Sequence, residues 1–490
     1  MRVAIPEKYL RLIILAVWIA ALFWGFNLIN LTPYGLNEGA AKSLLFLWSI
    51  VDRIANPVAT FGTPDMRAIL LLPVAVYWSG SMLATKIFTA MLAFFGALLL
   101  YYWARKDNHE SALMATALLL ICPLTITQIS SIGTGPMLLL TFGIGLWVSN
   151  TYRTKPRPLG GWFFIQLLVV MTAVSLHPAG LGYALALAWL WIRDPLNKPQ
   201  QKQILIGLAI AVPLIITFQN GWQKDIVWFS DPLATLANAI QNGAIGFGDP
   251  AGWFGGLIVA LLLIIVIIRD RAFLLNDLMG SALLFAVIVG LAAATPEWAV
   301  VAIALLLYRG LAQLVAINQS FNRNSLMGKR GIVIVVLMIV SIMFMLADKQ
   351  YRQVLQSELL SPTDNIIQQL AVEAADPDAP FQAASQWPAR TMLASRRDVF
   401  PLPYSAEDSA EFLDSIKGIT HLIFDHNLEA NSGLSKNISE LSGIAETLSL
   451  QEAGVVIHIK DIPTEPLATQ HAISGDAAES GDAEAPKTEN

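Results

Sequence analysis

The stretch PYGLNEGAAKSLLFLWSIVDRIANPVATFGTPDMR runs from Pro33 to Arg67, between the first two long apolar segments of the chain. After the extreme N-terminus, it is the most charged interval of the N-terminal region. Its aromatic and aliphatic residues are interspersed with Asn37, Glu38, Lys42, Asp52, Arg53, Asp65 and Arg67. An amphipathic segment with carboxylates and cations, held against a bilayer surface, is where chemistry is expected. The rest of the chain is therefore interpreted around it.

The composition is that of a membrane protein. Of the 490 residues, 55% are hydrophobic and only 14% are charged, whereas a soluble domain has about 25% charged residues. The net charge of −5 says little, because basic residues occupy short loops in the first two thirds and most acidic residues follow Asp348. The one cysteine, Cys122, lies in an apolar run and excludes an internal disulfide framework. Nothing in the composition indicates nucleic-acid binding.

Apolar runs define the candidate membrane spans, each of which needs roughly 20 residues. The first run is too long for a signal-peptide core and no cleavage site follows it, which predicts a retained transmembrane helix. The apolar stretch 68–79 is short and contains Pro73, which predicts a re-entrant or interfacial segment. We expect about eleven spans, near residues 10–31, 82–103, 111–128, 134–151, 161–177, 178–193, 203–218, 252–268, 278–295, 297–317 and 331–347.

The loop charges set the orientation. Successive loops alternate between a basic side and a side that holds only Lys42, Arg53, Arg67 and Lys224. The positive-inside rule makes the basic side, and with it the N-terminus, cytoplasmic. The first loop (32–67), the loop 219–250 and everything after Asp348 then face outward, into the periplasm if the membrane is a bacterial inner membrane. The basic residues are Arg2, Lys8, Arg11, Arg105, Lys106, Arg153, Lys155, Arg157, Arg193, Lys198, Lys202, Arg269, Arg271, Arg323, Lys329 and Arg330.

From about residue 348 to 462 the composition becomes that of a soluble domain. The apolar runs 419–424 (ITHLIF) and 454–460 (GVVIHIK) alternate with the helix-like segments 405–418 and 434–449, which predicts a small α/β domain. The acidic tail 463–490 lacks apolar periodicity and is expected to be disordered. The predicted fold is mostly α: a polytopic membrane helix bundle of about 11 spans (1–347), with an extracytoplasmic C-terminal α/β domain (348–462).

Asn37 and Glu38 follow the first span. A carboxylate there can act as general base on an acceptor hydroxyl if partial burial tunes its pKa. The alternative is structural, because Asn37 is a suitable cap for a helix that starts at Glu38.

Asp65 and Arg67 stand at the return to the membrane. A guanidinium at that depth suits a phosphate or diphosphate, and the alternative is an interfacial cation paired with Asp65. Lys86, at the start of the second span, raises the same question. His177 in SLHPAG is either a phosphate or proton ligand or a polar residue in a turn.

Other motifs are absent or ordinary. The sequence has no Walker loop, dinucleotide-binding glycine pattern, zinc motif or nucleophile elbow, which argues against an ATP-driven pump. Arg309, near the cytoplasmic end of the 297–317 span, is either functional or a snorkelling cation. His421, His426 and His458 lack metal-ligand spacing and are expected to be structural.

Several segments together resemble the C-type (GT-C) glycosyltransferase superfamily, in particular bacterial relatives of lipid A aminoarabinose transferase and protein O-mannosyltransferase. NEGAAKS is similar to the acidic pair and following helix of that superfamily, and FGTPDMRAILLLP to its return to the membrane. LATKIFTAMLAFFGALLLYYWARK, GPMLLLTFGIGLW, AVSLHPAGLGYALALAWLW and ATPEWAVVAIALLLYRG resemble later spans. The similarity covers nearly the whole chain and is weak at each motif.

The resemblance implies transfer of a sugar from a polyprenyl-phosphate carrier to a lipid, glycan or protein acceptor outside the cytoplasmic membrane. Glu38 would belong to the acidic pair, and Asp65 and Arg67 to the carrier-phosphate region. A divalent metal ion is the one cofactor that it suggests. Two positions depart from the pattern: Asn37 replaces the first carboxylate of the pair, and Gly135-Pro136 stands where many members carry another aspartate.

Three hypotheses follow from the sequence. The first is a polyprenyl-phosphate-dependent glycosyltransferase of the cell envelope, with Glu38 and Asn37 at the catalytic position and Asp65, Arg67, Lys86 and His177 binding substrate. The second is a catalytically inactive relative that binds a lipid carrier or scaffolds a protein partner in the membrane. The third and weakest is a secondary transporter. A transporter is expected to have a paired internal repeat and an ionisable residue at mid-membrane, and this sequence clearly shows neither.

Overall fold

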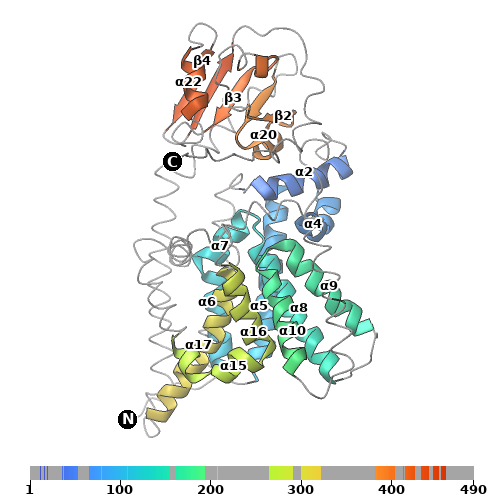
Figure 1. Cartoon of the computed structure of the whole chain (residues 1–490), viewed down its shortest axis with the longest axis vertical. Helices are drawn as coiled ribbons and strands as arrows, with labels where there is room; N and C mark the ends of the chain where they lie inside the picture. Colours follow the sequence, from blue (N-terminus) through green and yellow to red (C-terminus); the bar gives the residue numbers. More distant parts are fainter. Residues whose placement is uncertain are drawn as a thin grey trace, which may run out of the picture. The chain divides into compact units, whose positions relative to one another are not determined.

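The structure is a computed structural model (Figure 1). It describes the single residues 12, 16, 19, 36, 207 and 412, and the ranges 38–52, 66–78, 80–106, 109–154, 161–193, 264–290, 299–321, 381–402, 414–424, 432–440, 445–451 and 454–459. The chain divides into two compact units. One comprises Met1–Val51 with Pro64–Ser357, and the other comprises Asp52–Thr63 with Glu358–Asn490.

The first unit is helical. Most of its described helices are apolar along their whole length, as expected of helices buried in lipid or in a bundle. They are α2 (Glu38–Asp52), α4 (Met66–Tyr77), α5 (Met82–Ala104), α6 (His109–Ile121), α7 (Pro123–Ser130), α8 (Gly135–Thr154), α9 (Gly161–Leu176), α10 (Gly180–Arg193), α15 (Arg271–Asn276), α16 (Leu278–Gly290) and α17 (Ala299–Phe321).

Helices α5, α8, α9, α10, α16 and α17 each occupy one of the expected spans. Among the described residues, α5 is the one helix long and apolar enough to cross a membrane by length and composition, and several shorter apolar helices accompany it. The expected spans 10–31, 203–218 and 331–347, and most of 252–268, lie outside the described residues. The number of spans therefore stays a prediction.

The expected span 111–128 contains a helix break, because the chain forms two helices there, α6 and α7. The break falls at Cys122, where the Cys122 N–H donates to Leu119 O at 3.3 Å. Pro123 has no N–H to donate and its ring clashes with a preceding carbonyl, so it ends one helix and starts the next. The short segment around Pro73 forms a helix of 12 residues, α4.

Close helix contacts occur at glycines. A Cβ added to Gly96 of α5 would lie 2.7 Å from the backbone nitrogen of Leu140 in α8, and one added to Gly182 of α10 would lie 2.2 Å from the nitrogen of Ala286 in α16. Small residues let helix backbones approach closely, which is how apolar helices gain packing energy in a membrane. These two contacts define the α5–α8 and α10–α16 pairs.

Buried hydroxyl groups tie further helices together. The hydroxyl of Tyr308 in α17 lies 2.5 Å from Thr116 Oγ1 of α6 and donates to Ala97 O of α5 at 3.0 Å. In α9, Gln166 Nε2 donates to the hydroxyl of Tyr183 in α10 at 2.5 Å. Interhelical hydrogen bonds of this kind fix the register of helices that are otherwise held by apolar contacts.

One end of the bundle carries a closed ionic network, here called the Asp270 network (Asp270, Arg309 and Gln313). Asp270 Oδ2 accepts hydrogen bonds from Arg309 Nε at 2.8 Å and from Gln313 Nε2 at 2.9 Å. The Arg309 guanidinium also stacks 4.5 Å from the centre of the Phe273 ring. The role of Arg309, which the sequence left open, is therefore at least partly structural, because Arg309 pairs with Asp270.

The same end holds the α10–α15 contact. The carbonyl of Leu275 accepts hydrogen bonds from Trp189 Nε1 at 3.0 Å and from Arg193 Nη1 at 3.1 Å. Arg105 and Lys106 lie there too, just after α5 ends. Grouping of these residues at one end agrees with the loop charges, whereas the orientation of that end in a membrane stays a prediction.

The second unit contains a five-stranded sheet in the order β2-β1-β3-β5-β4. Strand β1 pairs in parallel with β2 and β3, and β5 pairs antiparallel with β3 and β4. The strands are β1 (Ala383–Ser385), β2 (Val399–Pro401), β3 (His421–Phe424), β4 (Ala445–Gln451) and β5 (Gly454–Ile459), with helices α20 (Pro388–Ser395) and α22 (Ser432–Glu440).

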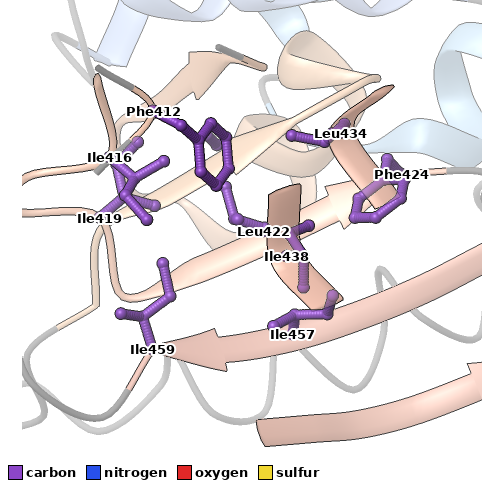
Figure 2. Close-up of a cluster of buried hydrophobic side chains, with 10 residues drawn as sticks. Phe412, Ile416, Ile419, Leu422, Phe424, Leu434, Ile438, Ile457 and Ile459 are labelled. Atoms are coloured by element: carbon purple, nitrogen blue, oxygen red, sulfur yellow. The ribbon is translucent and has the colours of Figure 1, made fainter. Parts of the chain in front are cut away.

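An apolar core covers one face of this sheet (Figure 2). Leu422, Phe424 and Ile457 project from the strands and meet Phe412 and Leu434 from the helical side. The mixture of helices and strands agrees with the expected small α/β domain. Its expected boundaries at residues 348 and 462 lie outside the described residues and stay predictions.

The prediction of a helix over 434–449 is confirmed for its first part and is wrong for its second part. Helix α22 ends at Glu440, and Ala445–Gln451 forms strand β4 instead. The sequence AETLSLQ alternates polar and apolar residues, a period of two that suits a strand at the edge of a sheet. A register shift between Thr447 and Ser449 marks an irregularity in its pairing.

Candidate functional site

Four of the expected site residues fall within the described part of the chain, and three of these lie at one end of the helix bundle. Helices α5, α8 and α10 begin at this end and α6 and α9 finish there, as Figure 1 shows. Lys86, the α7–α8 loop (131–134) and His177 therefore share the end opposite to the Asp270 network. We call this the polar end.

Arg67, the second residue of α4, is buried with 7% of its surface exposed. Its Nη1 donates to the main-chain oxygen of Ile132 at 3.4 Å. Ile132 is fully buried and has a φ of 54°, a left-handed conformation that is costly for a β-branched residue. The contact brings α4 to the α7–α8 loop and places the guanidinium at the polar end.

Lys86, in the first two turns of α5, is only 1% exposed. At 1.5 Å per residue it lies about 15 Å along the helix from the α8 contact at Gly96. The α7–α8 loop lies about 10 Å from the same contact along α8, so the backbone of Lys86 and the loop lie towards the same end of the bundle. A buried ammonium is costly unless anions or hydrogen-bond acceptors surround it.

His177 occupies the turn between α9 and α10 and is 4% exposed. Its Nδ1 accepts a hydrogen bond from the Ala179 N–H at 3.0 Å. Because Nδ1 accepts, the neutral ring carries its proton on Nε2, which makes Nε2 a donor. The turn is tight, since a Cβ on Gly180 would lie 2.0 Å from Ala173 O. This contact supports the structural role of His177, and a ligand role stays a prediction.

Glu38 is the first residue of α2 and is partly exposed. A carboxylate in the first turn of a helix interacts favourably with the positive end of the helix dipole. Asn37 and Asp65 lie outside the described residues. The expected roles of Asn37, Glu38 and Asp65 in the site therefore stay predictions.

Helix α7 carries polar residues that the sequence analysis did not single out. Thr125 is fully buried and Gln128 is 7% exposed. Thr125 Oγ1 and Gln128 Oε1 have no hydrogen-bond partner within the described part of the chain. The sequence contains one signal that could have identified them: a threonine and a glutamine stand three residues apart in a mostly apolar run.

A metal ion does not fit the described residues. Among them, no three histidine, cysteine or carboxylate side chains gather in one place. Helix α8 begins with Gly135-Pro136, which supplies no carboxylate. No catalytic step is therefore assigned to a metal.

What the polar end offers chemically is positive charge next to neutral hydrogen-bonding groups. Arg67 and Lys86 are cations in a poorly solvated place, where attraction for an anion is stronger than in water. Arginine matches phosphate oxygens with its planar fork, and lysine acts as a point charge. This combination suits a phosphorylated ligand that also carries hydroxyl groups.

Comparison with solved structures shows the class of fold. ArnT from Cupriavidus metallidurans matches with a TM-score of 0.55 in its apo state, at 12% identity over 90% of this chain and 97% of that one. The ArnT structure with bound undecaprenyl phosphate matches with the same TM-score, at 14% identity over 92% of this chain and 97% of that one. The oligosaccharyltransferase of Archaeoglobus fulgidus has a TM-score of 0.51, at 14% identity over 84% of this chain and 69% of that one.

These matches confirm the predicted resemblance, because ArnT and the oligosaccharyltransferase are both GT-C glycosyltransferases. The chain shares the overall fold of these two proteins, mostly helical with a small C-terminal mixed sheet. No protein-family model matches the sequence, and a search of curated proteins finds no match. At these identities the likeness concerns the fold alone.

Proposed function

We propose that this protein is an integral membrane glycosyltransferase that moves a sugar from a polyprenyl-phosphate carrier to an acceptor outside the cytoplasmic membrane. The observation that carries the proposal is the fold shared with ArnT over about nine tenths of both chains. The acceptor is a lipid, glycan or protein of the cell envelope. The N-terminus would be cytoplasmic and the C-terminal domain periplasmic.

The donor is proposed from the polar end. One of the matching ArnT structures contains undecaprenyl phosphate. In this chain the buried Arg67 and Lys86 are suited to hold the phosphate of such a carrier, and we propose that Asp65 and His177 contribute to the same site. Their charge would also stabilise the phosphate as it leaves the sugar, and stabilising the charge that develops in a transition state is a large catalytic effect.

In the proposed reaction, Glu38 accepts the proton of the acceptor hydroxyl. The hydroxyl oxygen then bonds to the anomeric carbon of the sugar while the bond from that carbon to the carrier phosphate breaks. Asn37, whose amide is not a base at neutral pH, would position the acceptor by hydrogen bonding. General base catalysis typically contributes about 10²- to 10⁴-fold to a rate.

Replacement of the proposed base tests this function. Glu38→Gln keeps the size of the side chain and removes its basicity, so transfer of a radiolabelled sugar from the lipid donor in membranes should fall about 100-fold or more. Lys42→Gln, an exposed change one turn later in α2, is the matched control and should transfer normally. Normal transfer by Glu38→Gln would show that Glu38 is not the base.

A second candidate is a catalytically inactive GT-C-like subunit that binds the lipid carrier or scaffolds a partner protein in the membrane. The start of α8 at Gly135-Pro136 favours it, because no carboxylate is present there. Carrier binding without transfer, a co-purifying protein, and an unchanged phenotype in a Glu38→Ala strain would support this candidate over the first.

A further inference from the structure

Helix α7, which leads into the α7–α8 loop of the polar end, carries two buried polar atoms. Thr125 and Gln128 are three residues apart and therefore share one face of the helix. Neither Thr125 Oγ1 nor Gln128 Oε1 has a hydrogen-bond partner among the residues that the structure describes. A buried polar atom left unsatisfied costs about 1–3 kcal/mol, so nearly all such atoms in native proteins have a partner.

Gln128 lies next to the peptide that Arg67 contacts. A Cβ added to Gly133 would lie 1.9 Å from Gln128 Oε1, so the amide group covers Gly133. The Gly133 N–H donates to Gln128 O at 2.7 Å, and the carbonyl of the same peptide, Ile132 O, accepts from Arg67. One peptide unit therefore separates Gln128 from the guanidinium.

The chemistry of the two atoms restricts the ligand. A carbonyl oxygen such as Gln128 Oε1 accepts only, so it requires an O–H or N–H donor and repels an anionic oxygen. The Thr125 hydroxyl both donates and accepts. A ligand that satisfies these two atoms and also suits the positive charge of Arg67 has hydroxyl groups close to a phosphate, as a sugar bound to a carrier phosphate does.

We propose that Thr125 and Gln128 bind the sugar hydroxyl groups of the lipid-linked donor, so that α7 distinguishes a sugar-loaded carrier from a bare one. The inference rests on the proposed function and adds to it a specificity element outside the acidic pair. The phosphate would interact with Arg67 and Lys86, and the sugar with the polar face of α7.

Two lipids test the inference on the full-length protein in nanodiscs: undecaprenyl phosphate and the same lipid carrying a hexose. The wild type should bind the hexosyl lipid more tightly. Thr125→Val and Gln128→Met should each weaken that binding about tenfold, the loss expected for one hydrogen bond to a sugar hydroxyl. Both variants should bind undecaprenyl phosphate as the wild type does.

Thr141→Val is the matched control. Thr141 is also a buried threonine, but its hydroxyl already donates to Met137 O at 2.8 Å within α8. It should leave the affinity for both lipids unchanged. The thermal midpoint of Thr125→Val should be equal to or above that of the wild type, because the change removes an unsatisfied hydroxyl.

The outcomes separate the two claims. A wild type that binds both lipids equally, or variants that bind the hexosyl lipid normally, would overturn the inference and leave the proposed function standing. A wild type that binds neither lipid would overturn both.

Discussion

The buried charged side chains at the two ends of the helix bundle have different kinds of hydrogen-bond partner. At one end Asp270 receives hydrogen bonds from Arg309 and Gln313, so that opposite charges and polar groups satisfy one another. At the polar end the Arg67 guanidinium contacts a neutral main-chain oxygen, and Thr125 and Gln128 retain atoms without a partner among the described residues. A closed network stabilises helix packing, whereas a polar cluster with unused hydrogen-bonding capacity is suited to a ligand.

The largest effect on stability should come from disrupting the Asp270 network. Asp270→Ala leaves Arg309 and Gln313 without their acceptor in a mostly buried place, and loss of one partner of such a pair costs about 3 kcal/mol. Thermal unfolding of the purified protein would measure this as a lower midpoint. Affinity for undecaprenyl phosphate should not change in the protein that remains folded.

The contrast would fail if Asp270→Ala weakened carrier binding as strongly as a change at the polar end. Asp277→Ala is a suitable comparison. Asp277 Oδ1 caps the following helix by accepting from the Met279 N–H at 2.8 Å. Its loss should cost only about 1 kcal/mol.

A smaller effect is expected in the C-terminal sheet, where the buried ring of His421 lies next to a second histidine. The rings of His421 and His458 lie 5.0 Å apart on adjacent strands, and His421 Nδ1 lies 2.8 Å from Thr420 Oγ1. Burial, and next the charge of His458, lowers the pKa of His421 from 6.5 to about 4.

Because the pKa of His421 is lower in the folded state, the unfolded chain binds a proton first as the pH falls. Stability should therefore be lost progressively as the pH falls from 6.5 towards 4. His421→Phe should remove that part of the pH dependence in thermal unfolding of the full chain. An unchanged pH dependence in this variant would show that His421 is not its source.

Much of the fold could be predicted from residue patterns alone. Apolar length located α5, α8, α9 and α10, because burial in lipid or in a bundle leaves a strong signal. The break at Pro123 was missed since hydropathy averages over it, although proline chemistry predicts it. Strand β4 was missed because its period of two lies in a polar edge segment that also reads as a helix.

The candidate site was harder to predict for a physical reason. Arg67 and Lys86 are charges in apolar surroundings and stand out in a sequence. Thr125 and Gln128 are uncharged, and only their burial without a described partner distinguishes them from ordinary helix residues. The Arg67 contact with Ile132 O joins residues far apart in the chain and requires a left-handed backbone at Ile132, neither of which a sequence pattern indicates.

The most direct test of the account is the affinity of the full-length protein for undecaprenyl phosphate when the cations of the polar end are removed. Arg67→Gln and Lys86→Met keep most of the side-chain volume and remove the charge, with Lys42→Gln as the exposed control. The account predicts that each buried change lowers the affinity about 100-fold, as expected for the loss of a buried charge that contacts a phosphate, while the control binds normally. Unchanged affinity in folded Arg67→Gln and Lys86→Met proteins would contradict the account.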